Sequence, residues 1–299
     1  MGFDSSIRFF HPVNPDTIDS PVPKAGFFSG FPYYVSGRHL KERKNRMEAS
    51  SLALIGLLSV FVGILIGGIG IGGVLLVPML TFVFGMGVHE AVGAAMFSYI
   101  FSGIVGASLY ARQGSINWTM ALWLFAGAIP AAFAGAYLSS VISSQGLEFI
   151  IALLIIFAGV NAILTRGEDI KDERVLSRPA LIGIGVVTGV GSALSGTGGP
   201  LVLVPVLVWL KVPVLTAVGL SQAVQLPIAS LATAGNVLYG SVNMTIGITL
   251  AVSLMIGATI GARIAHAVTG STLKNIVSWV LVVVGTFMVI RVARGWFGF

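Results

Sequence analysis

Two glycine clusters, each inside a long apolar run and followed by a proline, constrain the fold most. The first is Gly67-Gly68-Ile69-Gly70-Ile71-Gly72-Gly73, closed by Pro78, and the second is Ser195-Gly196-Thr197-Gly198-Gly199-Pro200, closed by Pro205. Each glycine in a helix costs up to about 1 kcal/mol relative to alanine, so this density disfavours a continuous helix. Broken backbone survives in a bilayer only where protein or a polar cavity satisfies its N–H and C=O groups.

The composition indicates whether these clusters lie in water or in a membrane. Of the 299 residues, 56% are hydrophobic and 9% are charged, whereas soluble domains carry about 25% charged residues. We therefore predict an all-α integral membrane protein. The chain has no cysteine, which excludes disulfides and thiolate chemistry. The net charge of +6 is spread over membrane flanks and forms no basic patch suited to nucleic acid.

The N-terminal residues 1–49 form a polar tail. A basic cluster at 38–46 directly precedes the first apolar run, so the positive-inside rule places the N-terminus in the cytoplasm. No apolar core of a cleaved signal peptide follows Met1. We expect a multi-pass protein of the bacterial inner membrane.

The apolar runs divide the chain into two halves with the same plan. The predicted units are a first transmembrane repeat at 50–165, a polar linker loop at 166–178 and a second transmembrane repeat at 179–299. Full crossings need roughly 20 apolar residues. The predicted helical runs are 51–66, 74–84, 91–111, 118–142 and 147–165 in the first half, and 179–194, 201–210, 217–238, 244–268 and 273–292 in the second.

The duplication is also visible in the residues. Gly114-Ser115-Ile116-Asn117 matches Gly240-Ser241-Val242-Asn243, 126 positions later. The same offset pairs Ala91-Val92-Gly93 with Ala217-Val218-Gly219, and Gly135-Ala136 with Gly261-Ala262. Three matches in one register indicate an internal repeat of four to five segments.

Two arrangements of the repeats are open. If each glycine cluster is the tip of a re-entrant hairpin, each half crosses the membrane three times and the halves are inverted. If each broken segment crosses once, each half crosses four times and the halves are parallel. The charge rule favours the second arrangement, because it then keeps the basic residues of 166–178 inside, and we accordingly expect about eight transmembrane helices plus broken or re-entrant glycine-rich segments. The short runs and the frequency of inverted repeats in transporters favour the first arrangement.

The order of motifs resembles that of the TauE/SafE family of sulfite-exporter-like permeases. The resemblance rests on the doubled glycine–proline motif, on Val88-His89-Glu90-Ala91-Val92-Gly93 and on Gly114-Ser115-Ile116-Asn117-Trp118, and it covers residues 50–293. It implies a secondary transporter of small sulfur-containing or organic anions, with sulfite and sulfoacetate as named substrates. Ser195 and Thr197 depart from the glycine-richer form of the second cluster.

The candidate site lies at the two clusters, where helices are expected to begin at Val74 and Pro200. Backbone N–H groups and the helix dipole at such N-termini attract anions, and a broken helix at matching positions of two halves indicates a transporter's binding site. The alternative is tight helix packing by small residues. The residues assigned to the clusters are Gly70, Gly72, Gly73, Ser195, Thr197, Gly198 and Gly199.

Polar residues of later helices complete the predicted site. They lie at corresponding places of the two halves, and their alternative role is to bond helices together. These residues are Ser98, Tyr99, Ser221, Gln222 and Gln225. His89, Glu90 and Arg112 are candidates for proton coupling, although the two ends of a helix at the membrane surface explain them as well.

The expected function is therefore export or exchange of small anions by a secondary transporter. The expected partners are the anion and membrane lipid, with homo-oligomerisation left open, and no cofactor or metal is predicted. No nucleotide-binding motif indicates a primary pump. An anion channel is the main alternative. An intramembrane serine hydrolase, with Ser195 as nucleophile and His266 as base, is the other.

Overall fold

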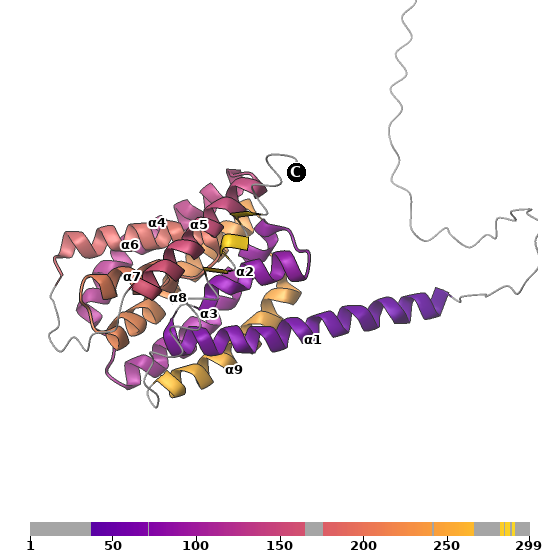
Figure 1. Cartoon of the computed structure of the whole chain (residues 1–299), viewed down its shortest axis with the longest axis horizontal. Coiled ribbons are helices and arrows are strands. Elements are labelled where there is room, and N and C mark those ends of the chain that lie inside the picture. Colours follow the sequence, from indigo (N-terminus) through magenta and orange to yellow (C-terminus); the bar gives the residue numbers. More distant parts are fainter. Residues whose placement is uncertain are drawn as a thin grey trace, which may run out of the picture. The chain divides into compact units, whose positions relative to one another are not determined.

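Most of the chain that the structure describes is helical. The computed structural model describes residues 37–70, 72–164, 176–240 and 242–265, and within 282–290 all residues except 284 and 288. No strand occurs in these segments. The elements, drawn in Figure 1, are α1 (Gly37–Ile69), η1 (Gly72–Leu75), α2 (Leu76–Pro78), η2 (Met79–Val83), α3 (Val88–Arg112), α4 (Trp118–Val141), α5 (Ser144–Leu164), α6 (Arg178–Ser195), α7 (Pro200–Trp209), α8 (Val214–Tyr239) and α9 (Met244–Ala265).

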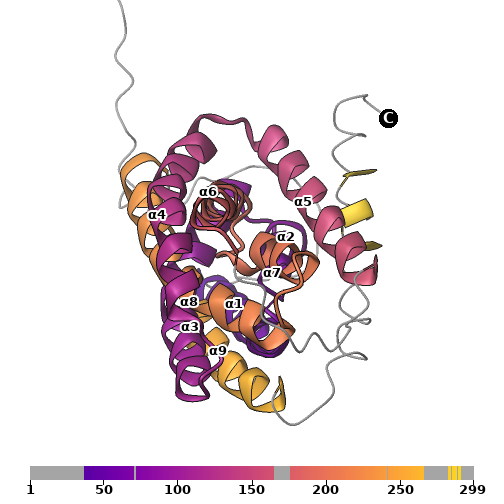
Figure 2. The same cartoon turned by 90° about the vertical axis from the view of Figure 1, so that its left-hand side faces the viewer.

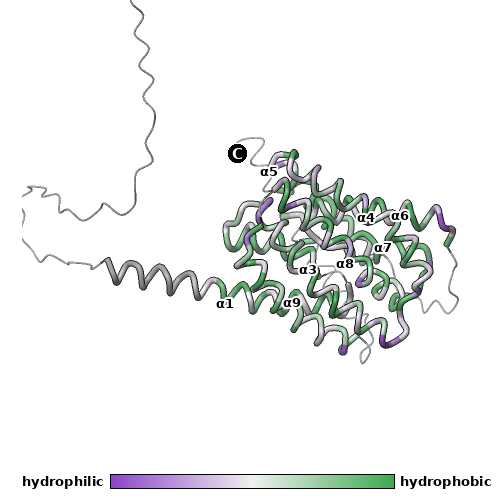
Figure 3. The backbone as a smooth tube through the Cα atoms, turned by 180° about the vertical axis from the view of Figure 1, so that it is seen from behind, coloured by the Kyte–Doolittle hydropathy of each residue, from purple (hydrophilic) through white to green (hydrophobic). Residues whose placement is uncertain are grey.

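Six of these helices are long and apolar enough to cross a membrane, which confirms the prediction of an all-α membrane protein. They are Ser50–Gly68 within α1, and α3, α4, α6, α8 and α9. Shorter apolar helices cover Gly72–Val83, Ser144–Phe157 and Pro200–Trp209. Figure 3 shows hydrophobic residues along the length of the bundle. By its contacts the chain separates into residues 1–44, of which only 37–44 are described, and residues 45–299, which carry all the membrane helices.

The helix bounds agree with the apolar runs to within a few residues, except near the first glycine cluster and at the start of α1, which begins at Gly37 inside the predicted polar tail. The helix α1 continues through Gly67 to Ile69, so the expectation that it ends at Ile66 is wrong. A Cβ at Gly67 would lie 2.8 Å from Ala258 Cα, which means that this glycine permits close packing on α9. The helix breaks at Gly70, whose φ of +80° suits glycine. Its counterpart Gly196, with a φ of +67°, ends α6 in the same way.

After each glycine cluster the chain turns back along the helix it has just left. A Cβ at Gly72 would meet Leu65 Cβ at 2.5 Å, so the segment Gly72–Val83 returns along α1. In the second half a Cβ at Gly191 would lie 3.3 Å from Val202 Cγ2, so α7 returns along α6. Each cluster is therefore the tip of a helical hairpin. The predicted run 273–292 and the linker 166–175 lie almost entirely outside the described residues.

The helices α3 and α8 run antiparallel through the middle of the bundle. A Cβ at Gly103 would lie 3.3 Å from Leu226 N, and one at Gly106 would touch Gln222. A Cβ at Gly219, near the start of α8, would lie 2.6 Å from Ser115 O, beyond the end of α3. Residue numbers therefore increase along α3 in the direction in which they decrease along α8, as expected for antiparallel helices. In the end-on view of Figure 2, α3 and α8 lie between α4 and α9.

The first helix of each half packs on a helix of the other half. A Cβ at Gly63 of α1 would lie 2.8 Å from Leu254 O of α9. A Cβ at Gly189 of α6 would lie 2.5 Å from Ala128 O of α4. Both members of the second pair are related to those of the first by the offset of 126 residues. The contacts of α1 with α9 thus match those of α6 with α4.

The two ends of the bundle are distinguished by their loops. At one end, named here the Asn243 end, the Asn243 side chain bonds to Glu90 at the start of α3. At the other, named the Ser115 end, the start of α8 lies beside Ser115, and Arg178 at the start of α6 lies over Trp123. Both hairpins return to the end from which they came, α1 to the Asn243 end and α6 to the Ser115 end.

Candidate functional site

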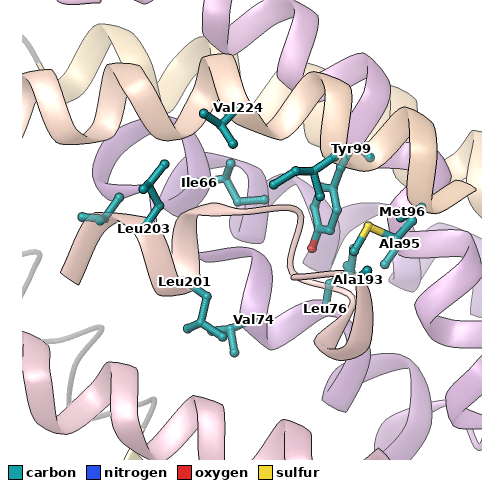
Figure 4. Close-up of a cluster of buried hydrophobic side chains, with 14 of the residues drawn as sticks. Ile66, Val74, Leu76, Ala95, Met96, Tyr99, Ala193, Leu201, Leu203 and Val224 are labelled. Atoms are coloured by element: carbon teal, nitrogen blue, oxygen red, sulfur yellow. The ribbon is translucent and has the colours of Figure 1, made fainter. Parts of the chain in front are cut away.

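The tips of the two hairpins meet at Tyr99, in the middle of α3. A Cβ at Gly73 would lie 2.9 Å from Tyr99 Oη and 3.1 Å from Thr197 O. A Cβ at Gly198 would lie 2.9 Å from Tyr99 Cδ2 and 3.3 Å from Gln225 Cγ. Figure 4 shows the Tyr99 ring at the centre of this region. Glycine at both tips thus allows the backbones of both clusters to reach the same aromatic ring.

Tyr99 holds the first tip in place. Its side chain is fully buried, and its hydroxyl group donates a 2.7 Å hydrogen bond to Gly73 O. A buried phenol usually needs such a partner, and the bond also satisfies a carbonyl group of the broken segment. Tyr99 therefore connects the centre of α3 to the tip of the first hairpin.

Gln225 connects the two central helices at the same level. Its Nε2 donates to Tyr99 O at 3.2 Å and to Ser102 Oγ at 2.8 Å. Tyr99 and Gln225 are 126 positions apart, so equivalent positions of the two halves touch each other. A carbonyl oxygen can only accept, which fixes Nε2 on that side. The Gln225 Oε1 atom is buried and has no hydrogen-bond partner among the described residues.

The second tip carries a pair of hydroxyl groups that bond to each other. Ser195 Oγ donates to Gly191 O at 2.6 Å and lies 2.8 Å from Thr197 Oγ1. Because a hydroxyl has one hydrogen, Thr197 is the donor in the second bond. Neither hydrogen is then free for a ligand in this conformation. The pair fixes the loop between α6 and α7. The bond to Gly191 O also occupies the Ser195 hydroxyl, which the hydrolase alternative requires as nucleophile. The proposed base of that alternative, His266, lies outside the described residues.

The start of α7 presents backbone donors beside Gln225. Pro200 is the first residue of this ten-residue helix, as predicted. The first bond of its ladder runs from Leu203 N to Gly199 O at 3.3 Å, so the N–H groups of Leu201 and Val202 precede the ladder. Such N–H groups lack partners within the helix and point along its positive end.

The first tip is built differently. The segment starts at Gly72 rather than Val74, and it consists of a four-residue 3₁₀ turn, three α-helical residues and a five-residue π turn. The expectation of a regular helix from Val74 is therefore wrong. The close contact of Gly72 with α1 explains the tighter start, because the chain begins to coil while it still lies against the preceding helix.

The remaining candidate residues of the glycine clusters and of α8 lie at different distances from Tyr99. A Cβ at Gly70 would lie 3.4 Å from Ser221 Oγ, and Gln222 Nε2 donates to Ile66 O at 2.9 Å. Both side chains thus contact the C-terminal end of α1. Gly199 lies beside the Gln225 backbone. The structure therefore gathers Gly70, Gly73, Tyr99, Thr197, Gly198, Gly199, Ser221 and Gln225 around the two tips, with Ser195 and Gln222 adjoining.

Two candidates have contacts elsewhere. Gly72 faces Leu65 of α1, and the Ser98 hydroxyl bonds back to Ala95 O of its own helix at 2.7 Å. Sequence spacing alone could not separate them from their neighbours, because it does not tell which face of a helix meets the tip.

The three coupling candidates lie at the ends of α3. Glu90 Oε1 accepts a 2.7 Å hydrogen bond from Asn243 Nδ2 at the Asn243 end, next to half-buried His89. Arg112 is exposed at the opposite end, about 33 Å away at 1.5 Å per residue. The remaining charged side chains that the structure describes also lie near helix ends or in loops. These are Glu148, Arg178, Lys211 and Arg263.

Sequence reasoning missed Tyr110 and Ser102. Tyr110 is fully buried, and its hydroxyl donates to Gly67 O at 3.0 Å, which caps the end of α1. Ser102 accepts the bond from Gln225 described above. The repeat offset could have identified Tyr110, because it pairs this tyrosine with Asn236, another buried polar residue.

Comparison with known proteins agrees with this architecture. The family model described as "Sulfite exporter TauE/SafE" matches residues 33–288. A probable membrane transporter protein of Methanocaldococcus jannaschii, MJ0441, is 28% identical over 82% of this chain and 99% of its own length. The Bacillus subtilis probable membrane transporter protein YdhB is 26% identical over 64% of this chain and 82% of its own length. No solved structure matches. The predicted resemblance is confirmed: the chain is a membrane transporter that belongs to the TauE/SafE sulfite exporter family.

Proposed function

We propose that this protein is a secondary transporter that exports small anions, of which sulfite, sulfoacetate and related organosulfur anions are the first candidates. The observation that carries the proposal is the start of α7, where the N–H groups that precede the helix's own hydrogen-bond ladder follow Gly199, which lies beside Gln225. A helix N-terminus of this kind favours a negatively charged ligand. Membership of the family supports the same class of substrate.

The region around the start of α7 has no charged side chain among the described residues, and this suits an anion that must be released better than one that is held tightly. The charged side chains in the described membrane helices lie at their ends, so no cation holds the anion tightly at the centre. Backbone N–H groups and the partial charge of a helix end supply attraction that a substrate can overcome when it leaves.

We infer that the two halves are inverted and that each crosses the membrane three times. Equivalent helices α3 and α8 are antiparallel, and equivalent residues Tyr99 and Gln225 touch. The axis relating the halves is therefore perpendicular to α3 and would lie in the membrane plane. The ten-residue α7 is about 15 Å long, half the hydrocarbon thickness. This arrangement favours the re-entrant alternative over the eight crossings that the charge rule favours.

Inverted halves with broken segments at the centre suit alternating access. The coupling ion is proposed to be a proton, taken up at Glu90 or His89 on the Asn243 end, with Arg112 attracting anions at the Ser115 end. A chain of this kind needs no nucleotide and no enzymatic step.

The decisive experiment measures flux of radiolabelled sulfite and sulfoacetate in proteoliposomes, with and without a pH gradient. We expect saturable flux of at least one anion that changes with the gradient. Flux that rises linearly with concentration would favour the anion channel instead. Absence of flux for both anions would remove the sulfur substrates from the proposal.

A further inference from the structure

Four buried polar groups without partners lie in the second half, away from the tips. They are Thr188 Oγ1 and Ser192 Oγ on α6, and Thr233 Oγ1 and Asn236 Nδ2 on α8. The exposed fractions of these side chains are 0%, 0%, 8% and 5%. Each atom lacks a hydrogen-bond partner among the residues that the structure describes.

The two hydroxyl groups on α6 do not bond to their own helix. Serine and threonine in a helix can satisfy themselves on a preceding carbonyl group, and Ser195, Ser221 and Ser98 do so here. The hydroxyl groups of Thr188 and Ser192 therefore remain available to a partner outside α6. An unsatisfied buried polar group costs about 1–3 kcal/mol, so water or a ligand is the expected partner at a polar site of this kind.

The two groups on α6 lie on one face of the helix together with Ser195. Thr188, Ser192 and Ser195 follow each other at spacings of four and three residues, which is one stripe of α6. The stripe ends at the second tip. The helix α6 packs on α8, and Asn236 lies one turn before the Asn243 end.

The offset of 126 residues indicates the direction of Asn236. Its counterpart Tyr110 donates from α3 to Gly67 O near the end of α1. The same relation pairs Asn236 of α8 with Ala193, near the end of α6. We therefore take the unpaired amide of Asn236 to face the polar stripe.

The four matching positions in the first half carry no unpaired polar atom, although Ser59 Oγ, one turn before Val62 on α1, is also buried without a partner among the described residues. The counterparts of Thr188 and Ser192 are Val62 and Ile66, with exposed fractions of 3% and 1%. The counterparts of Thr233 and Asn236 are Ala107 and Tyr110, and Tyr110 is fully buried with its hydroxyl bonded. Because α6 leads away from the Ser115 end and α1 leads away from the Asn243 end, the line on α6 runs toward the Asn243 end as it approaches the second tip, and the line on α1 runs toward the Ser115 end as it approaches the first tip.

We propose that the stripe of Thr188 and Ser192, with Thr233 and Asn236, is the water-filled arm of the transport path, and that Tyr110 with Val62 and Ile66 seals the opposite arm in this conformation. The proposal rests on the transporter function proposed above. The anion would travel between the middle of α6 and the Asn243 end along neutral hydroxyl and amide groups. These groups can exchange hydrogen bonds with a small oxyanion without trapping it as a cation would.

The test uses single cysteines, because the natural chain has none. Two matched pairs are made: Thr188→Cys with Val62→Cys, and Ser192→Cys with Ile66→Cys. The probe is the membrane-impermeant 2-sulfonatoethyl methanethiosulfonate, itself a small sulfonate, added to the full-length protein in oriented vesicles. Labelling is followed by mass spectrometry, so it needs no transport activity. Size-exclusion chromatography checks that each variant is folded.

We expect Thr188→Cys and Ser192→Cys to react about tenfold faster or more than their partners, and only from the side of the Asn243 end. Adding Tyr110→Ala to Ile66→Cys should make that cysteine reactive from the Ser115 end. Equal, slow labelling in both pairs would overturn the proposal and assign the polar groups to helix packing. Equal, fast labelling would overturn the seal.

The outcome is separable from that of the flux experiment. Fast labelling of Ser192→Cys without flux of sulfite or sulfoacetate would retain the arm and reject those substrates. Flux of either anion in the natural protein, together with slow labelling in both pairs, would retain the transporter function and reject this arm.

Discussion

At the scale of single residues, Tyr99 links most of the candidate site. It bonds to Gly73 O with its side chain and to Gln225 with its backbone, and it packs on Gly198. The position of both hairpin tips therefore depends on one aromatic ring. Two substitutions test this dependence in different ways.

Replacing Tyr99 with phenylalanine keeps the ring and removes the hydroxyl group. Gly73 O then loses a buried partner, so the protein should lose about 1–3 kcal/mol of stability and the KM for the anion should rise. Thermal unfolding in detergent and concentration-dependent flux measure the two effects. The control is Tyr137→Phe, which alters an exposed tyrosine on α4. Equal effects of the two substitutions would contradict the role of Tyr99.

Gly198→Ala should disrupt the second tip. The φ of +75° at this position disfavours any L side chain by about 1–2 kcal/mol, and the new Cβ would lie 2.9 Å from Tyr99 Cδ2. We expect lower stability and greatly reduced flux. Gly183→Ala is the matched control, because nothing lies within 4 Å of its Cβ and it sits in the exposed face of α6. That variant should be as stable as the natural protein or slightly more stable.

The hydroxyl pair at the second tip gives a weaker effect. Replacing Ser195 and Thr197 together with alanine removes the bond that orders the loop before α7, so anion binding should weaken by severalfold, about 1 kcal/mol. Isothermal titration with sulfite measures it. Unchanged affinity in a folded variant would remove the hydroxyls from the site. The exposed Ser140→Ala serves as control.

At the scale of elements, Asn117 and Asn243 cap equivalent helices with unequal partners. Asn117 accepts from Met120 N, and Asn243 accepts from Ile246 N and also donates to Glu90. Asn117→Ala should cost about 0.5–2 kcal/mol as a lost cap. Asn243→Ala should cost more, because it also releases the Glu90 carboxylate. Thermal unfolding of both variants measures the difference, and equal losses would show that the bond to Glu90 contributes nothing.

The sequence predicts the helices well and their packing poorly. Bounds such as those of α3 and α4 follow from apolar runs and from local signals, including the caps at Asn117 and Asn243. Glycine is ambiguous, because Gly67 serves close contact with α9 and Gly70 serves a break in the helix. That distinction depends on Ala258 of α9, 191 positions after Gly67, which no local pattern contains.

The candidate site shows the same division. The offset of 126 residues located Tyr99, Ser221 and Gln225 near both clusters, and the structure brings them there. It could not predict that the Ser195 and Thr197 hydrogens are taken by neighbouring oxygens, because that depends on rotamers. It also could not decide the direction of the hairpins, since a turn at glycine has the same sequence whether the chain continues or returns.

At the scale of the whole molecule, one pair of loops separates the two topologies. The inverted arrangement puts 113–117 and 240–243 on opposite sides of the membrane, whereas eight crossings would put them on the same side. Exposed Gln113 and Gly240 are suitable positions for single cysteines. We expect an impermeant maleimide to label Gln113→Cys and Gly240→Cys from opposite sides of oriented vesicles. Labelling from the same side would exclude the inverted arrangement.

The packing of α1 on α9 and of α6 on α4 has a consequence for how such a protein is made and how it arose. During synthesis α1 enters the membrane before its partner α9, which leaves the ribosome only after α3, α4, α6 and α8. Neither half can complete its helix contacts by itself. Separately expressed halves should therefore be degraded when alone and accumulate when produced together. In the inverted arrangement proposed above, an ancestral gene for one half would have worked only as a pair of identical chains inserted in opposite directions.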